Sequence, residues 1–146
     1  MSESPKVRFG ILCEDIRRED NGKLILIGVF GDAILVKEFP ALLTLANAVW
    51  FDLSTPFDGP LWSQVLLDDA QIAAAKAMAV IEAGRPVMAI QPIPLRVPKE
   101  GVLSFQLKFS EDGDWQTTTT VPIRLNPSAG ALQQPVSQSP PIVPPS

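Results

Sequence analysis

Carboxylates gather near the amino-terminal end of the chain, where Glu14, Asp15, Glu19 and Asp20 lie close together. Two carboxylates held near each other can share a proton or bind a hard cation such as Ca²⁺. Basic residues, Arg17 among them, are interleaved with these acids, and the spacing does not match the EF-hand pattern. The simplest interpretation is a solvated turn, with Glu14, Asp15, Arg17 and Asp20 as candidate contacts for a partner protein.

The same acidic residues define a remote catalytic alternative. Two carboxylates suffice for glycoside hydrolysis, so a carboxylate-based hydrolase built on Glu14, Asp15 or Asp20 is a hypothesis that the sequence allows. The interleaved basic side chains argue against it, because local neutralisation on a solvated hairpin accounts for the same pattern. We therefore predict no catalytic residue and no metal ligand.

Aromatic residues supply a second candidate site. Rings beside carboxylates can hold sugars or cations. The residues concerned flank a segment that carries Asp52 and Asp58, and they are Trp50, Phe51, Phe57 and Trp62. Trp50 and Trp62 are therefore the candidate platform for a small ligand or carbohydrate, with Trp115 as a further tryptophan. Core packing is the competing and favoured interpretation, because a domain with few aromatic residues usually buries them.

The chain has no histidine, no tyrosine and one cysteine, Cys13. The absence of histidine excludes Ser-His-Asp and Cys-His catalysis, imidazole acid–base chemistry and histidine-ligated zinc or haem. Cys13 falls at every second position with Val7, Phe9 and Ile11, which predicts that it shares their buried face of a strand. Its acidic neighbours disfavour the thiolate, so we expect an inert, buried thiol.

The remaining binding classes are excluded on composition. The two glycine-rich phosphate-binding motifs, Gly-x-x-x-x-Gly-Lys-Ser/Thr and Gly-x-Gly-x-x-Gly, are both absent from the sequence, so we expect no nucleotide cofactor. The net charge is −4, from 12 basic and 16 acidic residues, and the basic residues are scattered, which argues against nucleic acid as a partner. No uncharged apolar run reaches the roughly 18 to 20 residues needed to span a bilayer. The amino terminus lacks the pattern of a secretory signal, and with the single cysteine this indicates a cytoplasmic protein without a membrane partner.

Composition divides the chain into three parts. Residues 1–5 are expected to be a flexible N-terminus, and residues 6–125 a single domain. Residues 126–146 carry no charge and are rich in proline, serine and glutamine, which predicts a disordered tail. Pro141 and Pro144 stand at the PxxP spacing that binds in aromatic grooves, although such dense prolines satisfy this spacing by chance.

Short apolar runs separated by turn residues predict the strands that must position these side chains. Residues 7–13 and 103–109 alternate apolar and polar side chains, as strands with one buried face do. The Asp20-Asn21-Gly22 turn leads into residues 23–30, which are apolar on both faces and predict a central strand. Further strands are expected at residues 33–37, 45–53, 61–67 and 115–121.

Two segments are harder to interpret. Residues 70–83 are rich in alanine, which favours one short helix, yet their alternation also fits a strand, and we lean toward the strand. Residues 87–97 are strand-like but contain Pro92 and Pro94, which cannot donate ladder hydrogen bonds. This second segment is therefore expected at a sheet edge or in an irregular crossover.

Seven to nine short strands with turn signals every eight to twelve residues predict the fold. We expect a mostly β protein: a single antiparallel two-sheet β-sandwich of the immunoglobulin-like kind.

One stretch near the amino terminus resembles the opening of a family of small uncharacterised bacterial proteins. The residues that carry the resemblance are Cys13-Glu14-Asp15-Ile16-Arg17, Asn21-Gly22-Lys23 and Ile27-Gly28-Val29-Phe30-Gly31-Asp32. The similarity extends to about Leu125 and excludes the tail. It implies a small β-sandwich in the bacterial cytoplasm, and it supplies no functional residues to carry over.

These observations lead to a prediction by exclusion. We expect a non-catalytic protein-binding or assembly module, which contacts another protein or a second copy of itself. The alternative from a different class is a domain that binds a small ligand or carbohydrate on exposed tryptophans, namely Trp50, Trp62 or Trp115.

Overall fold

The computed structural model describes residues 4–128, apart from the side chains of residues 91–93. Within this range nine strands follow one another: β1 (Lys6–Arg18), β2 (Leu24–Val29), β3 (Ile34–Val36), β4 (Ala41–Asp52), β5 (Phe57–Leu67), β6 (Ala70–Ile81), β7 (Val87–Val97), β8 (Gly101–Lys108) and β9 (Gln116–Leu125). None of the described residues lies in a helix, and so none forms a helix able to cross a bilayer. The predicted PxxP segment and most of the predicted tail lie outside the described residues.

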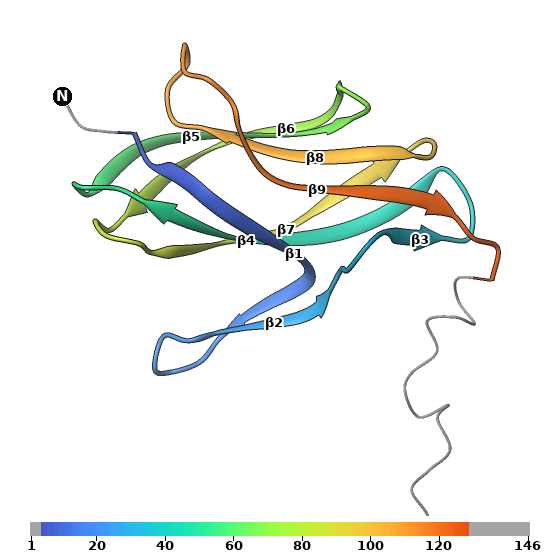
Figure 1. Cartoon of the computed structure of the whole chain (residues 1–146), viewed down its shortest axis with the longest axis horizontal. Coiled ribbons are helices and arrows are strands. Elements are labelled where there is room, and N and C mark those ends of the chain that lie inside the picture. The colour runs from blue at the N-terminus through green and yellow to red at the C-terminus, as the bar shows by residue number, and fades with distance from the viewer. Residues whose placement is uncertain (1–3, 129–146) are drawn as a thin grey trace, which may run out of the picture.

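The strands form two sheets (Figure 1), which confirms the prediction of a mostly β, two-sheet protein. A four-stranded sheet has the order β2-β1-β4-β7, and a five-stranded sheet has the order β3-β9-β8-β5-β6. The prediction of a purely antiparallel sandwich is wrong in one place, because β3 pairs parallel to β9. β3 joins this edge because the pairing buries Ile34 and Val36 in the core between the sheets.

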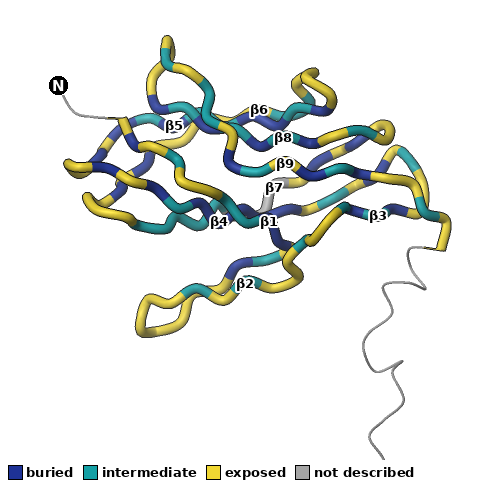
Figure 2. The backbone as a smooth tube through the Cα atoms, in the orientation of Figure 1, coloured by how far each residue is buried: buried dark blue, intermediate teal, exposed yellow. Residues whose placement is uncertain are grey.

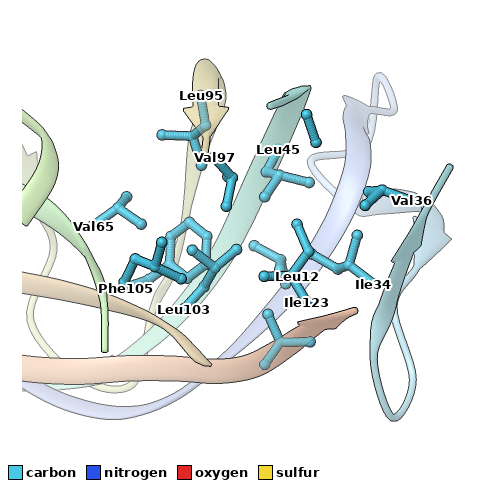
Figure 3. Packing of buried hydrophobic residues seen from close by; sticks show 13 residues of the cluster. Leu12, Ile34, Val36, Leu45, Val65, Leu95, Val97, Leu103, Phe105 and Ile123 are labelled. Carbon is cyan, nitrogen blue, oxygen red and sulfur yellow. The ribbon is translucent and has the colours of Figure 1, made fainter. Parts of the chain in front are cut away.

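The core lies between the two sheets. Figure 3 shows Leu45, Leu95 and Val97 of the four-stranded sheet across from Leu103, Phe105 and Ile123 of the five-stranded sheet. Along β7, β8 and β9 these residues alternate with more exposed ones, as a period of two requires. β4 is buried on both faces over residues 45–49, because Ala46 and Ala48 on its outer side pack with residues of the β1–β2 hairpin. A second cluster includes Val49, Phe51, Phe57, Leu107 and Phe109.

The hairpin of β1 and β2 corrects the expectation for residues 23–30. These residues were expected to form a central strand, but β2 is the edge of its sheet, and its side chains Ile25, Ile27 and Val29 are exposed. Leu24 and Leu26 on the opposite face pack against the outer surface of the four-stranded sheet. Figures 1 and 2 show this hairpin on the side of that sheet away from the core, with most of its surface exposed. The second apolar face of β2 therefore faces solvent and not a second layer.

The turn that closes this hairpin is the one that the sequence predicts. Glu19 and Lys23 are joined by a 2.8 Å backbone hydrogen bond, and Gly22 has a φ of +85°. Such a positive φ is readily adopted by glycine, which has no Cβ.

The two segments of uncertain structure are both strands. Residues 70–81 form β6 and pair with β5 in antiparallel fashion, so the preferred strand prediction is confirmed and the short helix is wrong. β7 lies at the edge of the four-stranded sheet, as its prolines predict. Pro94 pairs with Thr44 of β4.

Candidate functional site

The predicted acidic cluster does not assemble into one site. Glu14 and Asp15 are consecutive in β1, so their side chains leave opposite faces of the strand. Asp15 Oδ2 lies 3.1 Å from Arg17 Nε; the Arg17 side chain is largely exposed and that of Asp15 is half-buried. Asp20 lies in the exposed hairpin turn. Among residues 4–128 no group of three or more acidic, cysteine or histidine side chains could hold a metal ion.

Glu14 lines a shallow hollow between β1, β3 and β4. The hollow measures about 350 Å³, and its other lining residues include Phe30, Ile34 and Leu43. No second acidic residue lines it, so it lacks the paired carboxylates that hydrolysis or cation binding requires. Glu14 also packs against Gly28, where a Cβ would come within 2.8 Å of the Glu14 side chain.

The two tryptophans of the predicted ligand platform belong to different sheets. Trp50 lies on β4 of the four-stranded sheet, and its ring stacks on Phe9 with 4.7 Å between the ring centroids. Trp62 lies on β5 of the five-stranded sheet. Phe51 and Phe57, which were predicted beside them, are buried in the core, where both contact Phe109 edge to face. The four aromatic residues thus form no common platform, and the favoured prediction of core packing holds for the two phenylalanines.

Trp62 is accompanied by lysines and not by the expected carboxylates. Its cross-strand neighbours on both sides are Lys76 of β6 and Lys108 of β8. The Lys76 ammonium lies 4.9 Å from the centre of the Trp62 ring, and that of Lys108 lies 5.8 Å away. Lys108 also lies 4.8 Å from the centre of the Trp115 ring. The arrangement is a small cationic and aromatic patch on the outer face of the five-stranded sheet.

Cys13 is fully buried, as predicted, but on a different face from the one expected. It packs with Ile16, Ala46 and Ala48 under the β1–β2 hairpin, whereas Val7 packs in the core between the sheets. The pairing of β1 with β4 shifts register between Val7 and Phe9, and this irregularity changes the side on which the later residues point. Burial raises the pKa of the Cys13 thiol, with a smaller contribution from the nearby Asp15 carboxylate.

A buried polar group lies between the sheets and was missed from the sequence. Asn47 is 5% exposed, and its Nδ2 donates to Thr118 Oγ1 at 2.7 Å. Thr118 in turn donates to the carbonyl oxygen of Phe105. Gly10 makes this approach of β1, β4 and β9 possible, because a Cβ there would lie 2.8 Å from Asn47 Oδ1.

The hollow beside Asn47 is too small for a ligand. It measures about 40 Å³ and is lined by Asn47, Thr118 and apolar side chains of both sheets. A volume of this order holds a few water molecules, whereas ligand pockets measure about 300 to 1,000 Å³. This hollow is therefore too small to hold a sugar or a cofactor.

The free edge of β6 is the most distinctive feature of the surface, and the sequence reasoning did not single it out. β6 is 12 residues long and ends the five-stranded sheet, and no strand within residues 4–128 pairs with its outer side. Half of its residues are alanine, and Lys76 is its one charged residue. Met78 and Val80 are 72% and 77% exposed. The signal available in the sequence was a long, mostly apolar and alanine-rich run that contains only one charged residue.

The other three sheet edges are protected. β7 contains prolines, which cannot donate to an added strand. β3 has three residues. β2 has six, and Gly28 interrupts its pairing with a φ of +69°. Natural proteins protect sheet edges with such prolines, bulges, short strands and charges. β6 lacks most of these devices. It has one bulge, at Ile72, which has no partner residue on β5. After this bulge its backbone pairs regularly and contains no proline.

Comparison with family models and with curated proteins finds no match for this chain. The assignment of a function therefore rests on the geometry of the described residues.

Proposed function

We propose that the protein is a non-catalytic protein-binding module that binds its partner by strand addition at the free edge of β6. The observation that carries the proposal is the long, apolar and unprotected edge in a molecule whose other edges are protected. An exposed strand edge presents a row of N–H and C=O groups that an incoming strand can pair with. Exposed side chains such as Met78 and Val80 would contact the side chains of that strand.

Lys76 does not protect this edge as an isolated lysine would. Its ammonium is attracted to the face of Trp62 on the neighbouring strand, at 4.9 Å from the ring centre. The charge is thus directed back over the sheet and away from the position of an added strand. Burial of Met78, Val80 and the backbone edge would stabilise the complex, and no catalytic group is needed for this function.

Affinity capture with a matched pair of variants tests the proposal. Ala77→Lys places a charge at the exposed centre of the β6 edge, and Thr120→Lys adds the same charge on the exposed outer face of β9. The full chain should retain at least one protein, which Ala77→Lys loses and Thr120→Lys keeps. Equal capture by all three proteins would contradict strand addition at β6.

A second function is favoured by the patch around Trp62. Two ammonium groups beside Trp62, together with Trp115, suit a small anionic ligand better than a neutral sugar, because lysines already lie over the ring. Tryptophan fluorescence during titration with carboxylates, phosphates and sugars tests it. A saturable change that Lys108→Ala abolishes would support this function, and an unchanged spectrum would remove it.

The cellular setting and the finer fold class belong to the same proposal. The resemblance to small bacterial proteins and the single cysteine support a bacterial cytoplasmic protein of that family. The two-sheet arrangement supports a sandwich of the immunoglobulin-like class.

A further inference from the structure

The composition of β6 makes its edge complementary to itself. Residues on one face of the strand must lie beside residues on the same face of an added strand if the sheet is to continue. After the bulge at Ile72, β6 has a regular segment at residues 73–81. One face of this segment carries four alanines and then Ile81, and the outer face carries Ala74, Lys76, Met78 and Val80. A second β6 would therefore meet alanines along most of one face, and on the other face each large side chain can be placed opposite a smaller or flexible one.

We propose that the partner at the β6 edge is a second copy of this chain, paired antiparallel about a twofold axis at Ala77; this inference rests on the proposed function of β6. The two five-stranded sheets then join into one continuous sheet. A twofold interface of this kind uses the same surface patch on both subunits.

The register follows from side-chain size and overlap. Centring the pair on Ala77 aligns the whole regular segment with its copy, so Ala73 faces Ile81 and Ala75 faces Ala79. On the outer face, the same register places Val80 opposite Ala74 and Met78 opposite Lys76. The large residues Ile81 and Val80 thus each meet an alanine, and Met78 lies against the aliphatic stem of Lys76.

The charge of Lys76 excludes the neighbouring register. Centring the pair on Lys76 would place two ammonium groups directly opposite each other, which is destabilising. Centring it on Ala77 moves the two lysines to diagonal positions, about 7 to 8 Å apart. Each ammonium also keeps its position over the Trp62 ring of its own subunit.

The number of inter-strand hydrogen bonds in this pair matches that of a typical protein interface. Alternate residues of an edge strand direct their N–H and C=O groups outward, so a fully aligned segment of this length forms about eight to ten inter-strand hydrogen bonds. A typical protein interface carries about ten. The exposed Met78 and Val80 add apolar area to this ladder.

The oligomeric state of the full chain gives the first test. Sedimentation velocity over a range of concentrations should show the wild type and Thr120→Lys shifting from monomer to dimer. Ala77→Lys should remain a monomer at every concentration, with an unchanged circular dichroism spectrum as evidence that it folds. A wild type that stays monomeric throughout would overturn the inference.

Cysteine cross-linking tests the register. Ala77→Cys should form a covalent dimer with itself under mild oxidation, whereas Ala74→Cys and Val80→Cys should cross-link only when the two are mixed. The 77–77 and 74–80 pairs fall in opposite hydrogen-bonding classes, so the pair that is not hydrogen-bonded has the closer side-chain spacing and should cross-link faster than the other. Wild type is the control, because its Cys13 is fully buried. Cross-linking of Ala74→Cys or Val80→Cys alone, or none in any combination, would contradict the proposed register.

The two proposals fail in different ways. If the purified wild type is monomeric but Ala77→Lys still loses a different protein in affinity capture, strand addition at β6 stands and the second copy is wrong. If the wild type is monomeric and Ala77→Lys retains every captured protein, both proposals are wrong. A wild-type dimer that Ala77→Lys abolishes supports both.

Discussion

At the residue scale, Cys13 shows how burial controls a reactive group. The thiol is fully buried under the β1–β2 hairpin, and burial raises its pKa. We expect it to resist alkylation at pH 8 in the folded protein and to react readily in denaturant, because only the thiolate is nucleophilic. Equal rates in the two states, measured by mass spectrometry, would show that the site is open.

The same shift in pKa predicts how stability changes with pH. A raised folded pKa means that the folded state holds its proton after the unfolded state has lost it. The contribution of Cys13 to stability is therefore fully present below the unfolded thiol pKa of about 8.5 and is lost as the pH rises through the folded value. Between pH 7 and pH 10 the wild type should therefore lose more unfolding free energy than Cys13→Ala, and an equal change in the two proteins would show that no such shift exists.

The buried hydrogen bond between Asn47 and Thr118 gives a prediction about stability. Thr118→Val removes the acceptor of Asn47 Nδ2 and leaves a buried donor unpaired, which should cost about 1 to 3 kcal/mol. Thr120→Val changes an exposed residue of the same strand and should cost less than about 0.5 kcal/mol. Urea unfolding measures both variants, and equal losses would contradict the role of the hydrogen bond.

Sequence reasoning located individual side chains only in part. Alternation predicted that Cys13 is buried, but the period of two does not hold along β1, because the irregularity between Val7 and Phe9 turns the later residues to the other side and leaves Phe9 43% exposed. It did not reveal that Trp50 and Trp62 lie on different sheets, since alternation identifies a face of a strand and not the sheet to which the strand belongs. The contact between Asn47 and Thr118 was missed for the same reason, because it joins strands distant in sequence.

At the scale of elements, the β1–β2 hairpin contains its own control for a stability measurement. Leu26 packs against the outer face of the four-stranded sheet, and its neighbour Ile27 faces solvent. Leu26→Ala should lower the free energy of unfolding by about 1 to 3 kcal/mol, whereas Ile27→Ala should change it by less than about 0.5 kcal/mol. The opposite order would mean that the hairpin packs through its other face.

The strand-or-helix question at residues 70–81 was answered by pairing and not by propensity. Alanine favours helix by a few tenths of a kcal/mol per residue over most other residues. β5 pairs with β6 along nearly its whole length. This pairing places Ala79 and Ile81, two alternate residues near the carboxyl end of β6, in the core. The edge position of β2 could not be predicted from its sequence. The same apolar residues occur on a strand face that another layer covers and on a strand face that solvent reaches.

At the scale of the whole molecule, one core joins the two sheets. Leu103 is fully buried among residues from both sheets, and Val102 beside it is largely exposed. Leu103→Ala should cost about 2 to 5 kcal/mol, and Val102→Ala less than about 1 kcal/mol. Unfolding followed by tryptophan fluorescence and by circular dichroism should give coincident transitions for both variants, as expected of a single cooperative unit. Separate transitions would show that the sheets unfold independently.

The uneven protection of the sheet edges determines how far association can proceed. In the part of the chain that the structure describes, only β6 presents a long unprotected edge, so each molecule is monofunctional in the sense used in polymer chemistry. A monofunctional unit can form only one bond to another unit. Two such molecules that pair through β6 therefore form a dimer with no free β6 edge left, and the assembly stops there. The prolines of β7, the shortness of β3 and the interruption of β2 at Gly28 thereby act as chain terminators, and they allow an aggregation-prone strand to remain on the surface without fibre growth.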